Sequence, residues 1–268
     1  MAIDAADALR WAARIACCGV VLQSLELAML WREFGPRRLL ALQDEAAARD
    51  ATAMIPPFAC SCSATLAVLL GRSVAAAAVV WGANGASAPW LLAVLLGCQL
   101  YFIRRFPIVL TNADHMNLVV LAAVTVGLLP ATSEALRTIA LGFLAFQSQW
   151  AYMTSGLEKM WAPQWRSGVR LAEVFQDSPH RFAPLGAFFS MRRNVAKQAA
   201  WIVIVGECLF PLSLLLPKTA LLVALGAGVL FHAIIAVTMG LPSFFWAFVA
   251  TYPALYFFNG YVGAKPTG

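Results

Sequence analysis

A few polar and ionisable side chains stand inside segments that are otherwise apolar, and these side chains are the candidates for chemistry. A charged or strongly polar group at membrane depth costs several kcal/mol unless it is paired or faces a cavity. The candidate catalytic residues are Lys159 and His115. The candidate residues of a binding pocket are Asn112, Gln149, Tyr152, Glu207 and His232.

Helical spacing places three of these groups on one face. Gln149, Tyr152, Gly156 and Lys159 stand at positions i, i+3, i+7 and i+10, and residues spaced in this way line one side of a helix. That face would end in an amine beside a phenol and an amide. The pattern also fits a lysine that extends outward to the membrane interface and a tyrosine that only packs, so the spacing leaves both roles open.

The two histidines, the lysine and the glutamate stand on four different apolar segments, so they can meet only inside a bundle. A pocket built from them could bind a quinone, a lipid head group or a proton. Burial there would favour the neutral form of Lys159, which would then be a usable base near neutral pH. Ordinary structural roles stay open too: a polar helix end for His115, a hydrogen-bonded core position for His232 and an ion pair for Glu207.

The composition indicates which kind of protein positions these groups. The chain has 268 residues, of which 61% are hydrophobic and 12% charged, and its mean hydropathy is +0.75. A soluble domain averages nearer half apolar and a quarter charged. The composition therefore excludes a soluble enzyme, a disordered chain and a fibrous repeat, and it predicts an integral membrane protein with several spans.

We expect an all-α fold in which residues 1–268 form one domain, a polytopic transmembrane helix bundle of about eight spans, within a range of about seven to nine. An amphipathic interfacial segment is expected at 31–50. Arg72 is expected to end a span at 52–71. A break near 82–89 divides residues 73–105, which are expected to form one interrupted crossing, with two short spans as the alternative. The remaining spans are expected at 11–30, 115–130, 136–159, 199–216, 219–239 and 243–261.

The distribution of charge and the positions of the cysteines also indicate an integral membrane protein. The net charge of +6 does not indicate a nucleic-acid partner, because the basic residues stand in short connections between apolar segments, where Lys and Arg fix the orientation of membrane proteins. The six cysteines stand mostly inside apolar stretches, and their spacing matches no zinc site, so no metal is expected. The expected location is the plasma (inner) membrane of a bacterium.

Three stretches resemble one family of membrane proteins. Residues 149–160 (QWAYMTSGLEKM), with WRSG at 165–168, resemble the Y-x-x-[AS]-G-x-x-K-[LM]…W-x-x-G signature of the HTTM family, the horizontally transferred transmembrane domain. Residues 112–118 (NADHMNL) resemble a segment with asparagine and histidine that opens a family helix, and residues 231–244 (FHAIIAVTMGLPSF) resemble the F-H…M-G-x-x-x-F segment. The likeness covers nearly the whole chain, and the family includes the membrane domain of the vitamin K-dependent gamma-carboxylase.

The resemblance implies a quinone-dependent enzyme that is an oxygenase or is similar to the carboxylase. Lys159 matches the lysine that deprotonates a hydroquinone, His115 matches the histidine that supports this lysine, and His232 would be a further pocket residue. The implied cofactors are a menaquinone- or vitamin K-like hydroquinone and O₂, together with CO₂ where a glutamate side chain is carboxylated, and no metal. The implied partners are a membrane lipid or quinone and a peptide or small-molecule substrate; a partner protein is left open.

Two other functions stay open. Glu158 stands where the carboxylase has a second lysine, and the large extramembrane region with which the carboxylase grips its peptide has no counterpart in this sequence. Both differences favour a non-catalytic membrane protein that assists export of, or immunity to, a secreted peptide. The interruption at 82–89 and the intramembrane polar groups would suit a small transporter, although no internal repeat is detectable.

Overall fold

The computed structural model describes residues 3–30, 61–82, 87–106, 112–176 and 183–263. Its elements are α1 (Ala5–Met29), α3 (Cys62–Val80), α4 (Ala88–Arg105), α5 (Asn112–Leu128), α6 (Glu134–Trp161), α7 (Pro163–Arg166), α8 (Val169–Gln176), α9 (Ala183–Met191), α10 (Arg193–Leu209), the 3₁₀ helix η3 (Phe210–Leu215), α11 (Lys218–Met239), α12 (Pro242–Val249) and α13 (Tyr252–Gly263). Within these ranges the structure contains helices and no strands, which confirms the all-α class. The interfacial segment predicted at 31–50 lies outside the described residues.

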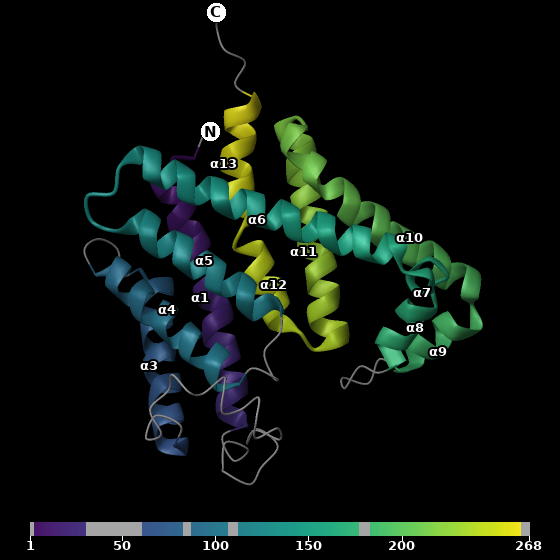
Figure 1. Ribbon diagram of the computed structural model, residues 1–268, viewed down its shortest axis with the longest axis horizontal. Coiled ribbons are helices and arrows are strands. Elements are labelled where there is room, and N and C mark those ends of the chain that lie inside the picture. The colour runs from purple at the N-terminus through teal and green to yellow at the C-terminus, as the bar shows by residue number, and fades with distance from the viewer. Residues whose placement is uncertain (1–2, 31–60, 83–86, 107–111, 177–182, 264–268) are drawn as a thin grey trace, which may run out of the picture.

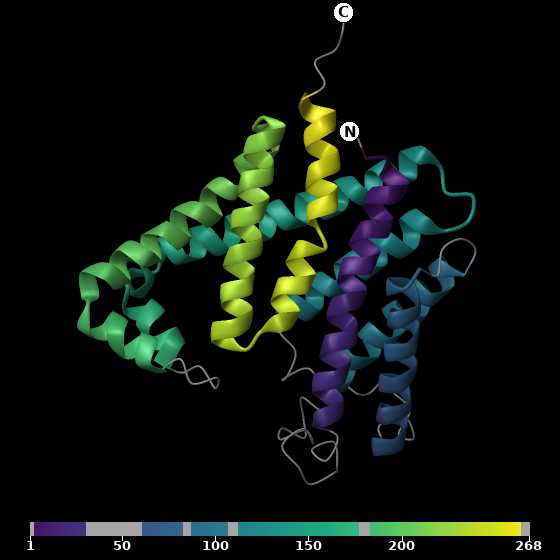
Figure 2. The same cartoon turned by 180° about the vertical axis from the view of Figure 1, so that it is seen from behind.

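The helices form two groups that α6 connects (Figures 1 and 2). On one side α1, α3, α4 and α5 pack against one another, and on the other side α10 and α11 stand with the short helices α7, α8 and α9. Helix α6 runs across the molecule and contacts α5, α1, α13 and α10 in turn. Helices α12 and α13 lie between the two groups and pack on α1, so the first and last helices share one apolar core.

Four helical segments of the described chain are long and apolar enough to cross a membrane: α1, α3, the continuous α10–η3 segment and α11. This finding is consistent with an integral membrane protein, but eight spans are not confirmed. The span predicted at 243–261 is divided into α12, with 8 residues, and α13, with 12 residues. At about 1.5 Å per residue these helices are roughly 12 and 18 Å long, and a bilayer core is about 30 Å thick.

Polar side chains cap the N-termini of three helices, and two of these helices, α1 and α6, begin earlier than the apolar runs predict. Helix α1 begins at Ala5 rather than at 11, because the Asp4 carboxylate accepts a hydrogen bond of 2.6 Å from the backbone N–H of Asp7. Ser61 and Ser133 cap α3 and α6 in the same way. A side-chain oxygen at this position satisfies a backbone donor that has no partner inside the helix.

The predicted boundary at Arg72 is wrong, because Arg72 lies in the middle of α3 and is fully buried. Its Nη2 donates to Gln23 Oε1 of α1 at 2.5 Å and to Gln99 Oε1 of α4 at 2.8 Å. Gln23 Nε2 in turn donates to a carboxylate oxygen of Asp114 on α5, and the guanidinium lies 5.1 Å from the ring centroid of Phe102. We call these four polar residues the Arg72 network. It gives the buried guanidinium two hydrogen bonds through Nη2, while Arg72 Nε and Nη1 are buried without a hydrogen-bond partner among the described residues.

The predicted interruption near 82–89 separates two helices in the structure. It falls between α3, which ends at Val80, and α4, which begins at Ala88, and these two helices pack against each other. The residues from 73 to 105 therefore form parts of two helices rather than one interrupted crossing. This arrangement weakens the comparison with a transporter, because the broken helix that motivated it is absent from the described residues of this segment.

Candidate functional site

The predicted polar face of α6 is buried in the structure. Gln149, Tyr152 and Gly156 are buried, and the Lys159 side chain retains 17% of its exposure. The face packs against α10 and the 3₁₀ helix η3 that follows it. We call this contact the α6–α10 seam. Because the seam places the amine of Lys159 toward α10 rather than toward solvent, the snorkelling arrangement does not describe this lysine.

The centre of the seam is an ion pair between α6 and α10. Lys159 Nζ lies 2.7 Å from Glu207 Oε2 and 3.0 Å from Glu207 Oε1, and the Glu207 side chain is only 9% exposed. Lys159 Nζ also donates to Ser155 Oγ at 2.5 Å, one helical turn away, and Ser155 Oγ donates to Glu207 Oε1 at 3.3 Å. The geometry therefore favours a charged ammonium and a charged carboxylate that satisfy each other.

Two neighbours of Lys159 on the chain have separate roles. Glu158 is exposed and points away from the seam, so the carboxylate that holds the lysine comes from α10 and not from the adjacent position. The ring of Trp165 lies 5.4 Å from Lys159 Nζ, within the range of a cation–π contact. The W of the W-x-x-G stretch is thus placed on the lysine by the short helix α7.

An aromatic cluster continues the seam toward α11 and α13. Tyr152 Oη lies 2.7 Å from His232 Nε2 and 2.8 Å from Tyr252 Oη, so three buried polar rings from three helices share one hydrogen-bonded centre. Tyr152 stacks on Phe210 at 3.9 Å between centroids, and His232 stacks on Phe248 at 4.5 Å. The second ring nitrogen of His232, Nδ1, is buried and has no hydrogen-bond partner. It can therefore accept or donate one further hydrogen bond, depending on the tautomer of the ring.

Gln149 joins the same seam one turn before Tyr152. Its Nε2 donates to Ser213 Oγ of η3 at 3.4 Å, while its Oε1 is buried without a hydrogen-bond partner. A side-chain amide whose oxygen accepts no hydrogen bond is costly to bury unless a ligand or a water molecule donates one to it. Two buried polar atoms along the seam, Gln149 Oε1 and His232 Nδ1, therefore have hydrogen-bonding capacity that the described residues do not use.

An apolar groove of about 520 Å³ opens between α10, η3 and α11. Most of its lining side chains are aliphatic or aromatic, and its polar lining residues are Tyr152, Glu207 and Ser213. Lys159 is not among the described residues that line it, and it reaches the groove only through Glu207. Among the described lining residues, the acidic side chain that a ligand in the groove would meet is therefore the carboxylate of Glu207.

The remaining predicted residues, on α5, are placed apart from the ion pair. His115 lies exposed on α5, whereas Asp114 and Asn117 on the same turn are buried. Asn112 begins the helix, and its side chain lies outside the described part of the chain. The support of Lys159 by His115 stays a prediction, while Glu207, His232, Tyr152 and Gln149 meet along the seam.

Gly156 explains why the two helices approach so closely. A Cβ atom at this position would lie 2.7 Å from Cys208 Sγ and 2.8 Å from the backbone nitrogen of Cys208. Both distances are shorter than real Cβ contacts, and the backbone atom cannot move aside alone. The small residue in the Y-x-x-[AS]-G-x-x-K pattern is therefore needed to bring Lys159 within reach of Glu207.

We expect Gly156→Ala to destabilise the protein by about 1–3 kcal/mol, because an added methyl group must separate α6 from α10. Gly97→Ala is the matched control, since a Cβ at this glycine of α4 would meet nothing within 4 Å. The control is expected to be neutral or to stabilise by up to about 1 kcal/mol through helix propensity. Thermal unfolding of the two purified variants in detergent measures the difference, and equal midpoints would contradict the close contact.

Three site residues were not singled out from the sequence. Ser155 stands one turn before Lys159, so helical spacing alone could have found it. Ser213 and Tyr252 belong to η3 and to the start of α13, where 3₁₀ geometry and the break after α12 decide their direction. No sequence periodicity indicates those two irregular positions.

The fold and the site define a class: a helical protein with candidate membrane spans and an apolar groove beside a buried ion pair. Among the residues described, no group of three or more His, Cys, Asp or Glu side chains could hold a metal ion. Comparison of the chain with known protein families, curated proteins and solved structures finds no match.

Proposed function

We propose that the chain is a quinone-dependent membrane enzyme, an oxygenase or carboxylase-like catalyst of the kind that the HTTM resemblance suggests, in the plasma membrane of a bacterium. The observation that supports it is the apolar groove whose wall contains Glu207, ion-paired to Lys159. The substrate would be a peptide or another small molecule.

The groove fits a hydroquinone with an isoprenoid tail. Its volume of about 520 Å³ falls within the roughly 300–1,000 Å³ of typical ligand pockets. Aliphatic side chains of α10, η3 and α11 would cover an apolar tail, and exposed positions such as Ile202 and Leu212 lie on the same face. Tyr152, Ser213 and Glu207 offer hydrogen bonds to a polar ring at the inner end.

The ion pair would perform the proton transfer. A bound hydroquinone would supply two electrons to O₂, and the oxygenated product of that reaction would serve as a strong base. Glu207 faces the groove, so its carboxylate is placed to accept the proton of a ligand hydroxyl, while Lys159 and Ser155 stabilise its charge. Lys159 and Glu207 would thus share the deprotonation of the hydroquinone, which the resemblance assigns to Lys159 alone. Tyr152, His232 and Tyr252 form a hydrogen-bonded path along which a proton can leave.

A groove-filling substitution tests the proposal. We expect Ala227→Trp to lower quinone binding and O₂-dependent hydroquinone oxidation at least tenfold, because an indole would occupy the groove that Ala227 lines. Val223→Trp is the matched control, since Val223 is an exposed residue of the same helix and is not among the groove residues. Mass spectrometry of copurified lipids and O₂ uptake with reduced menaquinone provide the two measurements.

The wild-type protein decides between this function and a non-catalytic one. The observation that favours a non-catalytic helper in peptide export or immunity is that Glu207, Ser155 and Trp165 already surround the Lys159 ammonium, so the pair could serve only to join α6 to α10. Under that alternative, purified protein would retain no quinone and would oxidise no hydroquinone in the presence of O₂. Retention of a quinone by the purified protein, or O₂-dependent oxidation of a hydroquinone, would exclude the non-catalytic alternative.

A further inference from the structure

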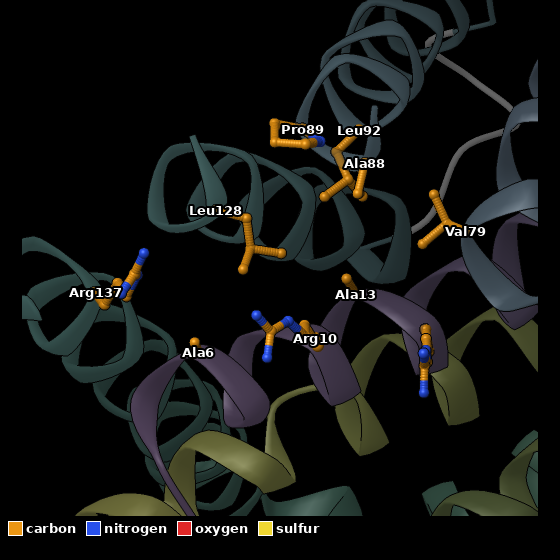
Figure 3. A pocket seen from close by; sticks show the side chains of 10 residues that line it. Ala6, Arg10, Ala13, Val79, Ala88, Pro89, Leu92, Leu128 and Arg137 are labelled. Carbon is orange, nitrogen blue, oxygen red and sulfur yellow. The ribbon is translucent and has the colours of Figure 1, made fainter. Parts of the chain in front are cut away.

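A second pocket, far from the seam along the chain, lies where five helices begin or end. It is lined by the starts of α1, α4 and α6 and by the ends of α3 and α5 (Figure 3). Its volume is about 100 Å³, enough for a small polar group and far less than the groove. Helix ends of a membrane bundle gather near the membrane surface, so a pocket built from helix ends is suited to meet lipid head groups.

Three arginines make this pocket basic. Arg10 and Arg14 of α1 and Arg137 of α6 line it, and Figure 3 shows Arg10 and Arg137 on different helices at the pocket. The other lining residues are Ala, Val, Leu and Pro. Planar guanidinium groups from two helices are suited to hold a phosphate through several N–H donors at once.

The acidic neighbours of Arg10 and Arg137 occupy only part of each guanidinium group. Arg10 pairs with Asp7 at 2.7 Å and Arg137 with Glu134 at 3.4 Å, both within single helices; the Arg10 side chain is 52% exposed and the Arg137 side chain 31%. Each such pair uses one Nη1 atom. Arg137 Nε is buried and has no hydrogen-bond partner, so this donor is already desolvated and awaits an acceptor.

Exposed tryptophans mark the same level of the molecule. Trp11 stands next to Arg10 and lies under the Arg14 guanidinium at 5.5 Å. Trp81 follows the end of α3, and Trp90 belongs to the first turn of α4; both are exposed. Tryptophan is enriched where the membrane meets water, so a phosphate at that depth can come from a lipid head group.

We propose that the pocket between Arg10, Arg14 and Arg137 binds the phosphate group of an anionic phospholipid or a free phosphate ion. This site is separate from the quinone groove and does not depend on it. The apolar walls formed by Val79, Leu92 and Leu128 would contact the carbon atoms next to a lipid phosphate.

Native mass spectrometry of the purified full chain tests the site with phosphatidylglycerol as the probe. We expect Arg10→Gln/Arg137→Gln to weaken its retention at least tenfold, while Arg10→Lys/Arg137→Lys keeps part of it. Arg170→Gln is the matched control, because Arg170 also forms an exposed i,i+3 pair, with Glu173, but lies on α8 outside the pocket. Retention of phosphatidylglycerol by the wild-type protein should also fall as the salt concentration rises. This measurement does not depend on the folding of any variant.

A competition experiment with inorganic phosphate identifies the source of the phosphate. Displacement of phosphatidylglycerol by millimolar inorganic phosphate would assign the pocket to the free ion, and resistance to that displacement would assign it to the lipid. Equal retention by the glutamine double variant and the wild type would overturn the proposal, as would retention that rising salt does not change.

Discussion

Replacing Arg72 with methionine is expected to lower the free energy of unfolding by roughly 3–5 kcal/mol, since removal of one partner from a buried charged network leaves the others without compensation. Methionine keeps an unbranched apolar side chain but removes the guanidinium group, and with it both hydrogen bonds to Gln23 and Gln99 and the charge that faces Asp114. Burial of the amide oxygens of Gln23 and Gln99 without this donor adds to the loss. Unfolding in mixed detergent micelles, followed by tryptophan fluorescence, measures the change.

The control for this prediction is Arg170→Met, which removes an exposed arginine that pairs with Glu173 within α8. Exposed pairs contribute about 0–1 kcal/mol, so its effect should be several times smaller. A double variant with Arg72→Met and Gln99→Leu should recover part of the loss, because apolar groups then replace both members of a polar contact. A loss below about 1 kcal/mol for Arg72→Met would show that the network is not essential to the four-helix packing.

The second large effect concerns the ion pair of the seam. Lys159→Met should abolish hydroquinone oxidation and also destabilise the fold by roughly 3–5 kcal/mol, because Glu207 would stay buried without its counter-ion. Adding Glu207→Leu should restore most of the stability, since the carboxylate that lacked a partner is then removed. The double variant should nevertheless remain inactive, because the proton-accepting group is absent.

This double substitution separates two roles that a single variant confounds. Lys197→Met is the matched control, as Lys197 is an exposed lysine at the start of α10, and it should change neither stability nor O₂ uptake. Activity retained by the double variant would refute proton transfer by the pair. Stability that does not recover would instead show that the seam needs the charges for packing.

The class of the fold could be predicted from composition, but the boundaries of its helices could not. Apolar runs locate the parts of helices that contact lipid or core, whereas capping side chains such as Asp4 and Ser133 decide where the backbone becomes helical. Arg72 misled the prediction because a charge normally marks the end of a span. The other members of its network come from three other helices, and no local pattern reveals contacts so distant in the sequence.

The candidate site shows the same division between local and distant information. The face of α6 with Gln149, Tyr152 and Lys159 could be predicted because its spacing is local. The pairing of Lys159 with Glu207 rather than with Glu158 depends on how closely α6 approaches α10, which Gly156 permits. The exposure of His115 likewise depends on the rotation of α5, which the buried neighbours Ala113 and Asp114 determine.

The contact of α1 with α12 bears on how the protein is made. Gly19 of α1 lies against the side chain of Trp246, so one face of the first helix is completed by residues near the end of the chain. At about 5–20 residues per second of synthesis, α1 waits on the order of tens of seconds for this partner. During that interval its alanine-rich inner face must be covered by lipid, by α3 or by an insertion factor, so core closure is a late step of biogenesis.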